Sequence, residues 1–211
     1  MSDAPIYNLD VSAFKRDPYP DLSVMREVSP ICFVPELDAT LFTKRADIFV
    51  NEKRIDVFSS LQPDGLMTRL MGENMMRKDG VEHQRERRII APSVSPKSVK
   101  NVWLSYFNDY ADALLDELES KGSGDLIKLY AMPLSAEALK LITGLTNMHF
   151  KEMDRVSQGM IDGCANYTGD KQIEAQCHDC TASIDRHIDE MAEVLSNCPD
   201  TSLLSVQLAA G

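Results

Sequence analysis

Two side chains able to hold an anion stand four residues apart in a short basic stretch at residues 79–92. They are His83 and Arg87. This spacing places both side chains on one face of an α-helix, one turn apart, so both could bind the oxygens of one carboxylate or phosphate group. Arginine adds a planar fork that matches a carboxylate at two points. The stretch therefore predicts a helix that can bind an anion.

A plainer interpretation of the same stretch stays open. Arg85 and Arg88 point to other sides of the helix, where they would meet water or an acidic partner. The helix would then be a solvated basic surface with ion pairs such as Glu82 with Arg85. Spacing alone favours this plainer interpretation, so the anion site needs support from the neighbouring sequence.

The residues around the pair define both ends of the helix that must position it. Asp79 and Gly80 form a turn that can cap the helix. Glu82 places a carboxylate in the first turn, where the helix dipole favours negative charge. Pro92 ends the helix after Ala91.

The sequence before this stretch predicts short elements. Its first 17 residues are polar and predict a surface coil. Two short apolar runs predict strands that pair as a hairpin. The expected elements are a helix at 21–28, strands at 30–35 and 40–43, a helix at 44–51 and a helix at 66–71.

The sequence after the basic stretch is plainly helical. Apolar residues recur every three or four positions, and glycines mark several ends. We expect helices at 97–120, 133–144, 149–166, 171–196 and 202–210, with a short strand or extended segment at 125–127. The fourth of these helices would follow a break at 167–170, and the third would be interrupted near Gly163.

Composition excludes several classes of function. The chain has 211 residues, 44% of them hydrophobic, and a net charge of −11, which argues against general affinity for nucleic acid or anionic membrane. No apolar run approaches the length of a membrane span. Five cysteines, without the spacing of a disulfide framework, indicate a reducing cytoplasm.

The Cys-x-x-Cys pair at Cys177 and Cys180 has two interpretations. It could be half of a zinc or redox site, but a structural zinc site needs four ligands and no second pair lies nearby in the sequence. Both sulfurs also fall on the apolar stripe of the 171–196 helix. We therefore expect them to be packed as small hydrophobic side chains, and we assign neither metal ligands nor catalytic residues within the chain.

The stretch DGVEHQRERR, which begins at Asp79 and is followed by Ala-Pro, resembles the C helix of soluble, bacterial-type cytochromes P450. In that family a His-x-x-x-Arg pair, here His83 and Arg87, binds haem propionates. Val81 replaces the usual proline, which affects the helix entry and not the two donors. Asp-Pro-Tyr-Pro at residues 17–20 also looks like the opening of the family's first helix.

The resemblance implies a mainly α fold with a small N-terminal β-sheet, the cytochrome P450 fold, truncated before the I helix. Residues 1–211 would be the N-terminal half of a single P450 domain, with the β element at about 30–43 and helices B to H within 44–211. The family's I helix, Glu-x-x-Arg helix and cysteine loop do not occur in the sequence. We therefore expect a fragment of a longer enzyme.

For the parent protein, the resemblance implies a haem-thiolate monooxygenase. It would insert one oxygen atom from O₂ into a small apolar or aromatic substrate, with electrons from a ferredoxin-type donor. The iron ligand is expected in the missing C-terminal half, so this chain alone would be inactive. The alternative is a non-enzymatic helical module that uses its basic helix to bind an acidic protein.

The resemblance also implies two sets of contact residues. The loop at 61–78 and the ends of the lid helices would shape the substrate pocket, although methionines more often fill a core. The expected pocket residues are Leu66, Met67, Met71, Met75, Met76, Met160, Ile161 and Cys164. The expected face for the electron donor consists of Arg85, Arg88, Lys97 and Lys100.

Overall fold

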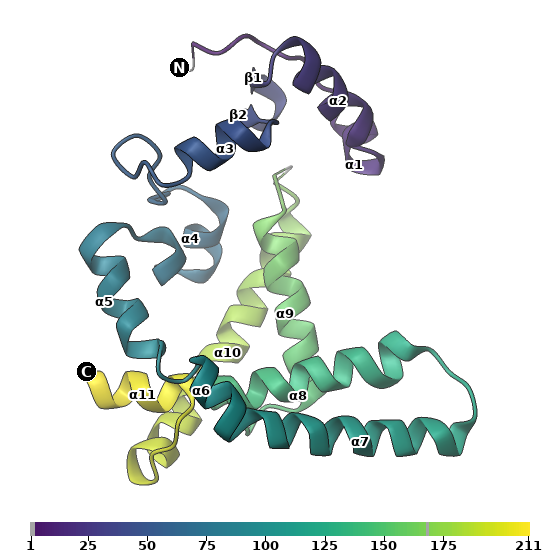
Figure 1. Ribbon diagram of the computed structural model, residues 1–211, viewed down its shortest axis with the longest axis vertical. Coiled ribbons are helices and arrows are strands. Elements are labelled where there is room, and N and C mark those ends of the chain that lie inside the picture. Colours follow the sequence, from purple (N-terminus) through teal and green to yellow (C-terminus); the bar gives the residue numbers. More distant parts are fainter. Residues whose placement is uncertain (1–2, 168) are drawn as a thin grey trace. The chain divides into compact units, whose positions relative to one another are not determined.

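Residues 61–211 are built around two antiparallel helices, α9 (Phe150–Cys164) and α10 (Lys171–Asn197). The structure is a computed structural model and describes residues 3–167 and 169–211. The chain divides into two units, Met1–Ser60 and Leu61–Gly211, each with its own hydrophobic core. Figure 1 shows α9 and α10 side by side in the larger unit.

The first unit holds the small sheet that the sequence predicts. Strands β1 and β2 pair antiparallel, with Ile31 opposite Phe42 and Val34 opposite Ala39. Cys32 and Val34 point into a core that also contains Met25 of the preceding helix. The elements are α1 (Val11–Arg16), α2 (Tyr19–Val28), β1 (Ile31–Val34), η1 (Pro35–Leu37), β2 (Ala39–Phe42) and α3 (Arg45–Asn51).

The expectation of a coil over the first 17 residues is wrong for residues 11–16, which form α1. The Asp10 side chain accepts the backbone N–H of Ala13 at 3.0 Å and so caps this helix. Leu9 is buried, and Phe14 packs on the same core. A short polar segment thus becomes helical because one cap and two apolar contacts hold it.

The second unit is almost entirely helical, as the periodicity predicts. Its glycines end helices where expected, since Gly122 and Gly144 both adopt the left-handed conformation at a helix end. Besides α9 and α10, it contains α4 (Leu66–Met71), η2 (Met75–Arg77), α5 (Gly80–Ile90), α6 (Pro96–Ser98), η3 (Val99–Trp103), α7 (Leu104–Lys121), η4 (Ile127–Ala131), α8 (Met132–Thr143) and α11 (Leu203–Ala210).

Between residues 125 and 170 the sequence predicts a short strand and two helix breaks. Residues 125–127 do not form a strand: the Asp125 carboxylate accepts the backbone N–H groups of Ile127 and Lys128, which starts the helical turn η4. Helix α9 ends at Cys164, next to Gly163, near which the sequence predicts an interruption. The Asp170 side chain caps α10, whereas Thr168, part of the predicted break at 167–170, lies outside the described residues.

Helices α9 and α10 approach each other closely because glycines face cysteines. A Cβ atom added to Gly163 would lie 2.5 Å from Sγ of Cys177, and one added to Gly159 would overlap with Sγ of Cys180. Both cysteines are buried, and Cys180 belongs to the main core. The Gly-x-x-x-Gly spacing of α9 therefore matches the Cys-x-x-Cys spacing of α10.

An ion network ties the same two helices together at the start of α9. The Arg155 guanidinium donates to Glu152 at 2.7 and 2.8 Å and to Asp179 of α10 at 2.8 Å. The Ser183 hydroxyl donates to Glu152 at 2.6 Å. The Arg155 and Ser183 hydrogen bonds lower the pKa of Glu152 to about 2.

Two smaller helices lie against this pair and position the segments of interest. Helix α4 packs on both α9 and α10, and the Thr181 hydroxyl donates to the carbonyl of Leu70 at 3.1 Å. Helix α11 packs on α10, α8 and α5. The Trp103 indole N–H donates to the carbonyl of Ser93 at 2.7 Å and fixes the turn that follows α5.

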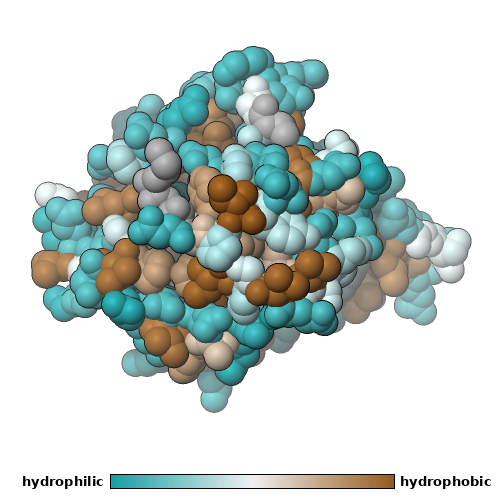
Figure 2. Space-filling view, turned by 90° about the horizontal axis from the view of Figure 1, so that it is seen from above, coloured by the Kyte–Doolittle hydropathy of each residue, from teal (hydrophilic) through white to brown (hydrophobic). Residues whose placement is uncertain are grey.

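Hydrophobic side chains remain on the surface of the described residues. Leu126 and Ile127 are more than 60% exposed. Figure 2 shows such hydrophobic surface in separate groups among hydrophilic side chains. None of the helices in the described part of the chain combines the length and the apolar character that crossing a membrane would require.

Gly159→Ala should destabilise the chain because the new methyl group collides with the Cys180 sulfur. The collision should outweigh the better helix propensity of alanine, which is worth about 1 kcal/mol. In a Cys180→Ala background the same change should be neutral or stabilising. Thermal unfolding of the four proteins gives the coupling free energy. Cys198→Ala, at an exposed position, is the matched control and should not change the effect of Gly159→Ala. If the effects of Gly159→Ala and Cys180→Ala on stability simply added, the proposed contact would be contradicted.

Glu152→Gln should lower the free energy of unfolding at pH 7 by about 2 kcal/mol. The folded pKa of about 2 lies below the ordinary value of 4.5, so the carboxylate stabilises the fold above pH 4.5. This contribution is lost as the pH falls from 4.5 towards 2. Denaturant unfolding of both proteins across this range should therefore show a difference that disappears in acid. Glu117→Gln, which breaks an exposed ion pair, should have little effect at any pH.

Candidate functional site

Helix α5 forms within one residue of the predicted ends, although the Asp79 side chain does not make the expected capping hydrogen bond. Asp79 occupies the N-cap position in an extended conformation, and its carbonyl accepts the N–H of His83 at 3.4 Å. Glu82 lies in the first turn, and Ala91 follows the last helical residue. The contact with α11 anchors α5 within the second unit (Figure 1).

His83 and Arg87 lie one turn apart on α5. His83 is half-buried and Arg87 is exposed. Within residues 3–167 and 169–211, neither side chain takes part in a hydrogen bond or an ion pair. Both therefore keep their donors available for a ligand that approaches this face of the helix.

The intrahelical pairing on α5 differs from the expected pair of Glu82 with Arg85. Glu86 instead pairs with Lys78, which precedes the helix. This pairing raises the pKa of Lys78 and lowers the positive charge at the helix entry. Arg88 donates to Gln84 at 3.5 Å, a weak contact at the limit of hydrogen bonding.

The residues expected to face an electron donor are all exposed. They follow one another along α5, α6 and η3. In a chain with a net charge of −11, this is a local concentration of positive charge. The residues are Arg85, Arg88, Lys97 and Lys100. Their role remains a prediction.

The residues expected to shape a substrate pocket do not all lie together. Met71 of α4 and Cys164 of α9 meet, with their sulfur atoms 3.9 Å apart. Met160 packs against the main core. Met76 and Ile161 are about 60% exposed. The contact between α4 and the end of α9 thus brings two distant parts of the predicted set together, while the pocket role itself remains a prediction.

The three remaining residues of the expected substrate pocket lie near Met71 in the sequence. Leu66 and Met67 lie in α4, and Met75 opens the turn η2. All three side chains are half-buried. Methionines here partly pack within the unit, which agrees with the plainer alternative that they fill a connector.

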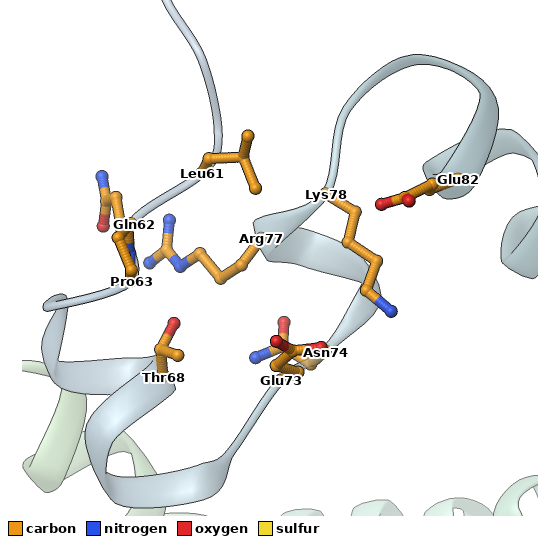
Figure 3. Close-up of a pocket in the computed structure, with 9 residues that line it drawn as sticks. All are labelled: Leu61, Gln62, Pro63, Thr68, Glu73, Asn74, Arg77, Lys78 and Glu82. Atoms are coloured by element: carbon orange, nitrogen blue, oxygen red, sulfur yellow. The ribbon is translucent and has the colours of Figure 1, made fainter.

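A pocket of about 240 Å³ lies between the start of residues 61–78 and the entry of α5. Arg77, Thr68 and Gln62 are among its lining residues. Figure 3 shows the Arg77 side chain extending across the pocket towards Gln62, with Thr68 below it. Sequence reasoning missed Arg77, because nothing in its spacing distinguishes it from the other basic residues of this stretch.

The Cys-x-x-Cys pair is packed, as the apolar stripe predicts. Cys177 and Cys180 are at most 2% exposed, and burial raises the pKa of both thiols. Among the described residues there is no group of three or more His, Cys, Asp or Glu side chains that could hold a metal ion. The chemistry of these cysteines is that of small core residues.

Comparison with known proteins relates the chain to cytochromes P450, although no family model matches it. The chain is 25% identical over 166 residues to the polyketide biosynthesis cytochrome P450 PksS of Bacillus subtilis (strain 168), covering 71% of this chain and 41% of that protein. It is 19% identical over 197 residues to the putative cytochrome P450 YjiB of the same strain, covering 92% of this chain and 48% of that protein.

Solved structures show the same fold. P450BioI, crystallised in complex with an acyl carrier protein ligated to hexadec-9Z-enoic acid, matches with a TM-score of 0.77 at 16% identity, covering 95% of this chain and 54% of that one. CalO2 matches with a TM-score of 0.73 at 18% identity, covering 95% and 52%. The predicted P450 fold is confirmed, and the chain spans about half the length of the relatives it matches, consistent with an N-terminal half.

The five thiols should react with a maleimide in the order of their exposure. Cys198 is exposed and should be modified first, followed by the half-buried Cys164. The buried thiols of Cys32, Cys177 and Cys180, whose pKa is raised by burial, should react only after unfolding. Mass spectrometry of native and denatured samples would resolve these steps. Early modification of Cys177 would contradict its packing.

Proposed function

We propose that this chain, which has the cytochrome P450 fold, is the N-terminal half of a haem-thiolate monooxygenase. The complete protein would insert one oxygen atom from O₂ into a small apolar or aromatic substrate, with electrons from a ferredoxin-type donor. The observation that carries the proposal is the pair of donors on α5, His83 and Arg87, within a fold shared with P450s over half their length. Alone, without a thiolate ligand, the chain would be inactive.

The α5 pair suits the propionate groups of haem. His83 and Arg87 are one turn apart and have no partner among the described residues. A neutral or charged imidazole can donate one hydrogen bond, and the guanidinium can donate two in parallel to one carboxylate. The pair would therefore orient haem from its carboxylate edge.

Haem held by a cysteine thiolate supplies the activation of O₂, while the protein supplies binding and orientation. In this half, the side chains near the contact between Met71 and Cys164 would shape the apolar side of the substrate pocket. The largely apolar character of the expected pocket set fits an apolar or aromatic substrate. Exposed hydrophobic surface also fits a longer protein that covers part of it.

Long-range charge supports the proposed electron donor. The exposed basic residues of α5, α6 and η3 would attract an acidic protein and speed its encounter with the enzyme. The effect should weaken at high salt, because these charges are exposed to solvent.

The same basic residues support a second candidate function, a non-enzymatic module that binds an acidic protein. The two proposals differ in whether the protein requires haem. A module requires no haem, and the 211-residue chain should then fold cooperatively and bind its protein partner alone. An enzyme half requires the remaining sequence for a stable haem site.

Replacement of His83 and Arg87 by alanine should reduce haem occupancy of the complete protein about tenfold or more, because two hydrogen-bond donors to the propionates are lost. The measurement is the ratio of haem absorbance to protein, together with the spectrum of the reduced carbon monoxide complex. Gln84→Ala, at an exposed position of the same helix, is the matched control. Unchanged haem occupancy in the double variant would contradict the role of the pair, and absence of a thiolate-type band in the unaltered protein would contradict the proposed enzyme.

A further inference from the structure

The pocket beside Arg77 is framed by a loop that maintains its own shape. The Asn74 side chain accepts the N–H of Met76 at 3.1 Å and donates to the carbonyl of Gly72 at 3.3 Å. The N–H of Arg77 donates to the carbonyl of Asn74 at 3.0 Å. These bonds fix the backbone from which Arg77 projects, and its side chain extends into the pocket (Figure 3).

Arg77 and Thr68 each bring a buried polar atom without a hydrogen bond to this pocket. Nε of Arg77 and Oγ1 of Thr68 are both buried, and neither forms a hydrogen bond within the described part of the chain. A buried donor left without a partner destabilises the fold, and a charged one does so more strongly. A built pocket with two such groups aimed into it therefore favours a ligand that can satisfy both.

We propose that this pocket binds the carboxylate of a small organic acid, with Arg77 as the anchor. The guanidinium would donate two parallel hydrogen bonds to the carboxylate oxygens, and the Thr68 hydroxyl would donate a third. The inference goes beyond the proposed function, because none of the residues expected to shape the substrate pocket lines this one. The binding site itself depends on the pocket alone.

The charges around the pocket select a monoanion. Lys78 also lines it, but its ammonium group is paired with Glu86. Glu73 and Glu82 line the pocket as well and would repel a dianionic phosphate. The Arg77 guanidinium can offset one negative charge on a ligand, whereas Glu73 and Glu82 oppose a second.

The remaining walls and the size of the pocket describe the rest of the acid. Leu61 and Pro63 provide apolar surface beside the guanidinium (Figure 3). The volume of about 240 Å³ is smaller than the roughly 300–1,000 Å³ that encloses a drug-sized ligand. The pocket thus fits a carboxylate with a short carbon chain, or the carboxylate end of a longer acid.

A carboxylate at Arg77 could come from an organic acid in solution or from a haem propionate. The two sources differ in what Arg77 would control. An organic acid would bind less tightly when Arg77 is replaced, with haem retention unchanged. A propionate would make haem dissociate faster when Arg77 is replaced, with acid binding unchanged.

The test is calorimetric titration of the complete, haem-loaded protein with hexanoate, 1-hexanol and inorganic phosphate. We expect hexanoate to bind at least tenfold more tightly than 1-hexanol or phosphate. Arg77→Gln should weaken hexanoate binding about ten- to hundredfold and leave 1-hexanol unaffected. Arg69→Gln removes the same charge from the exposed surface of the neighbouring helix α4 and should leave hexanoate binding unchanged.

Three outcomes would overturn the proposal: equal binding of hexanoate and 1-hexanol, tighter binding of phosphate, or hexanoate binding that survives Arg77→Gln. The rate of haem transfer to apomyoglobin tests the propionate alternative. We expect the unaltered protein and Arg77→Gln to lose haem at equal rates. Faster haem loss in Arg77→Gln with unchanged hexanoate binding would assign the site to a propionate and overturn the organic acid. The reduced carbon monoxide spectrum of the same sample tests the enzyme assignment separately, because hexanoate binding does not require a thiolate ligand.

Discussion

The second unit depends on the close approach of α9 and α10, which two glycines permit. Without side chains at Gly159 and Gly163, the sulfurs of Cys180 and Cys177 fill the space between the helices. Close packing of this kind tolerates little added volume, since protein interiors are nearly as dense as organic crystals. The network around Glu152 and Arg155 then fixes the relative position of the two helices along their axes. The glycines determine the distance between α9 and α10, and the ion network determines their relative position along the axes.

The candidate site is positioned by α9 and α10 through the helices α4 and α11, which pack against them. Leu70 lies against the position where Gly163 has no side chain, and its carbonyl accepts the Thr181 hydroxyl, so α4 is held by both helices. The loop from α4 to α5, which carries Arg77, begins at that anchored helix. At its other end, α5 is held by α11, which in turn packs on α10. Residues far along the chain, such as Thr181, 111 positions after Leu70, thus position the basic stretch.

Most helices could be predicted from sequence because each buries one stripe of apolar residues, and this periodicity is local information. The hairpin and α5 were also predicted, since prolines, a cap and an acidic first turn mark their ends. The strand at 125–127 was wrong because the apolar run Leu126-Ile127 is compatible with either structure, and the Asp125 cap decides between them. Helix α1 was missed because its cap and its contacts are few. The packing of Gly159 and Gly163 against Cys180 and Cys177 could not be predicted, because the sequence does not show that α9 and α10 face each other.

The site shows the same division between local and tertiary information. The spacing of His83 and Arg87 is visible in the sequence, because a helix converts a four-residue interval into a shared face. Arg77 has no such interval, and its distinction is tertiary: its guanidinium projects into a pocket and finds no partner there. The two arginines also differ in their surroundings. Arg87 lies among exposed basic residues that attract any anion, whereas Arg77 stands beside Glu73 and Glu82, which penalise a second negative charge. Arginine supplies the affinity in both places, and the neighbouring carboxylates determine which anion is accepted at Arg77.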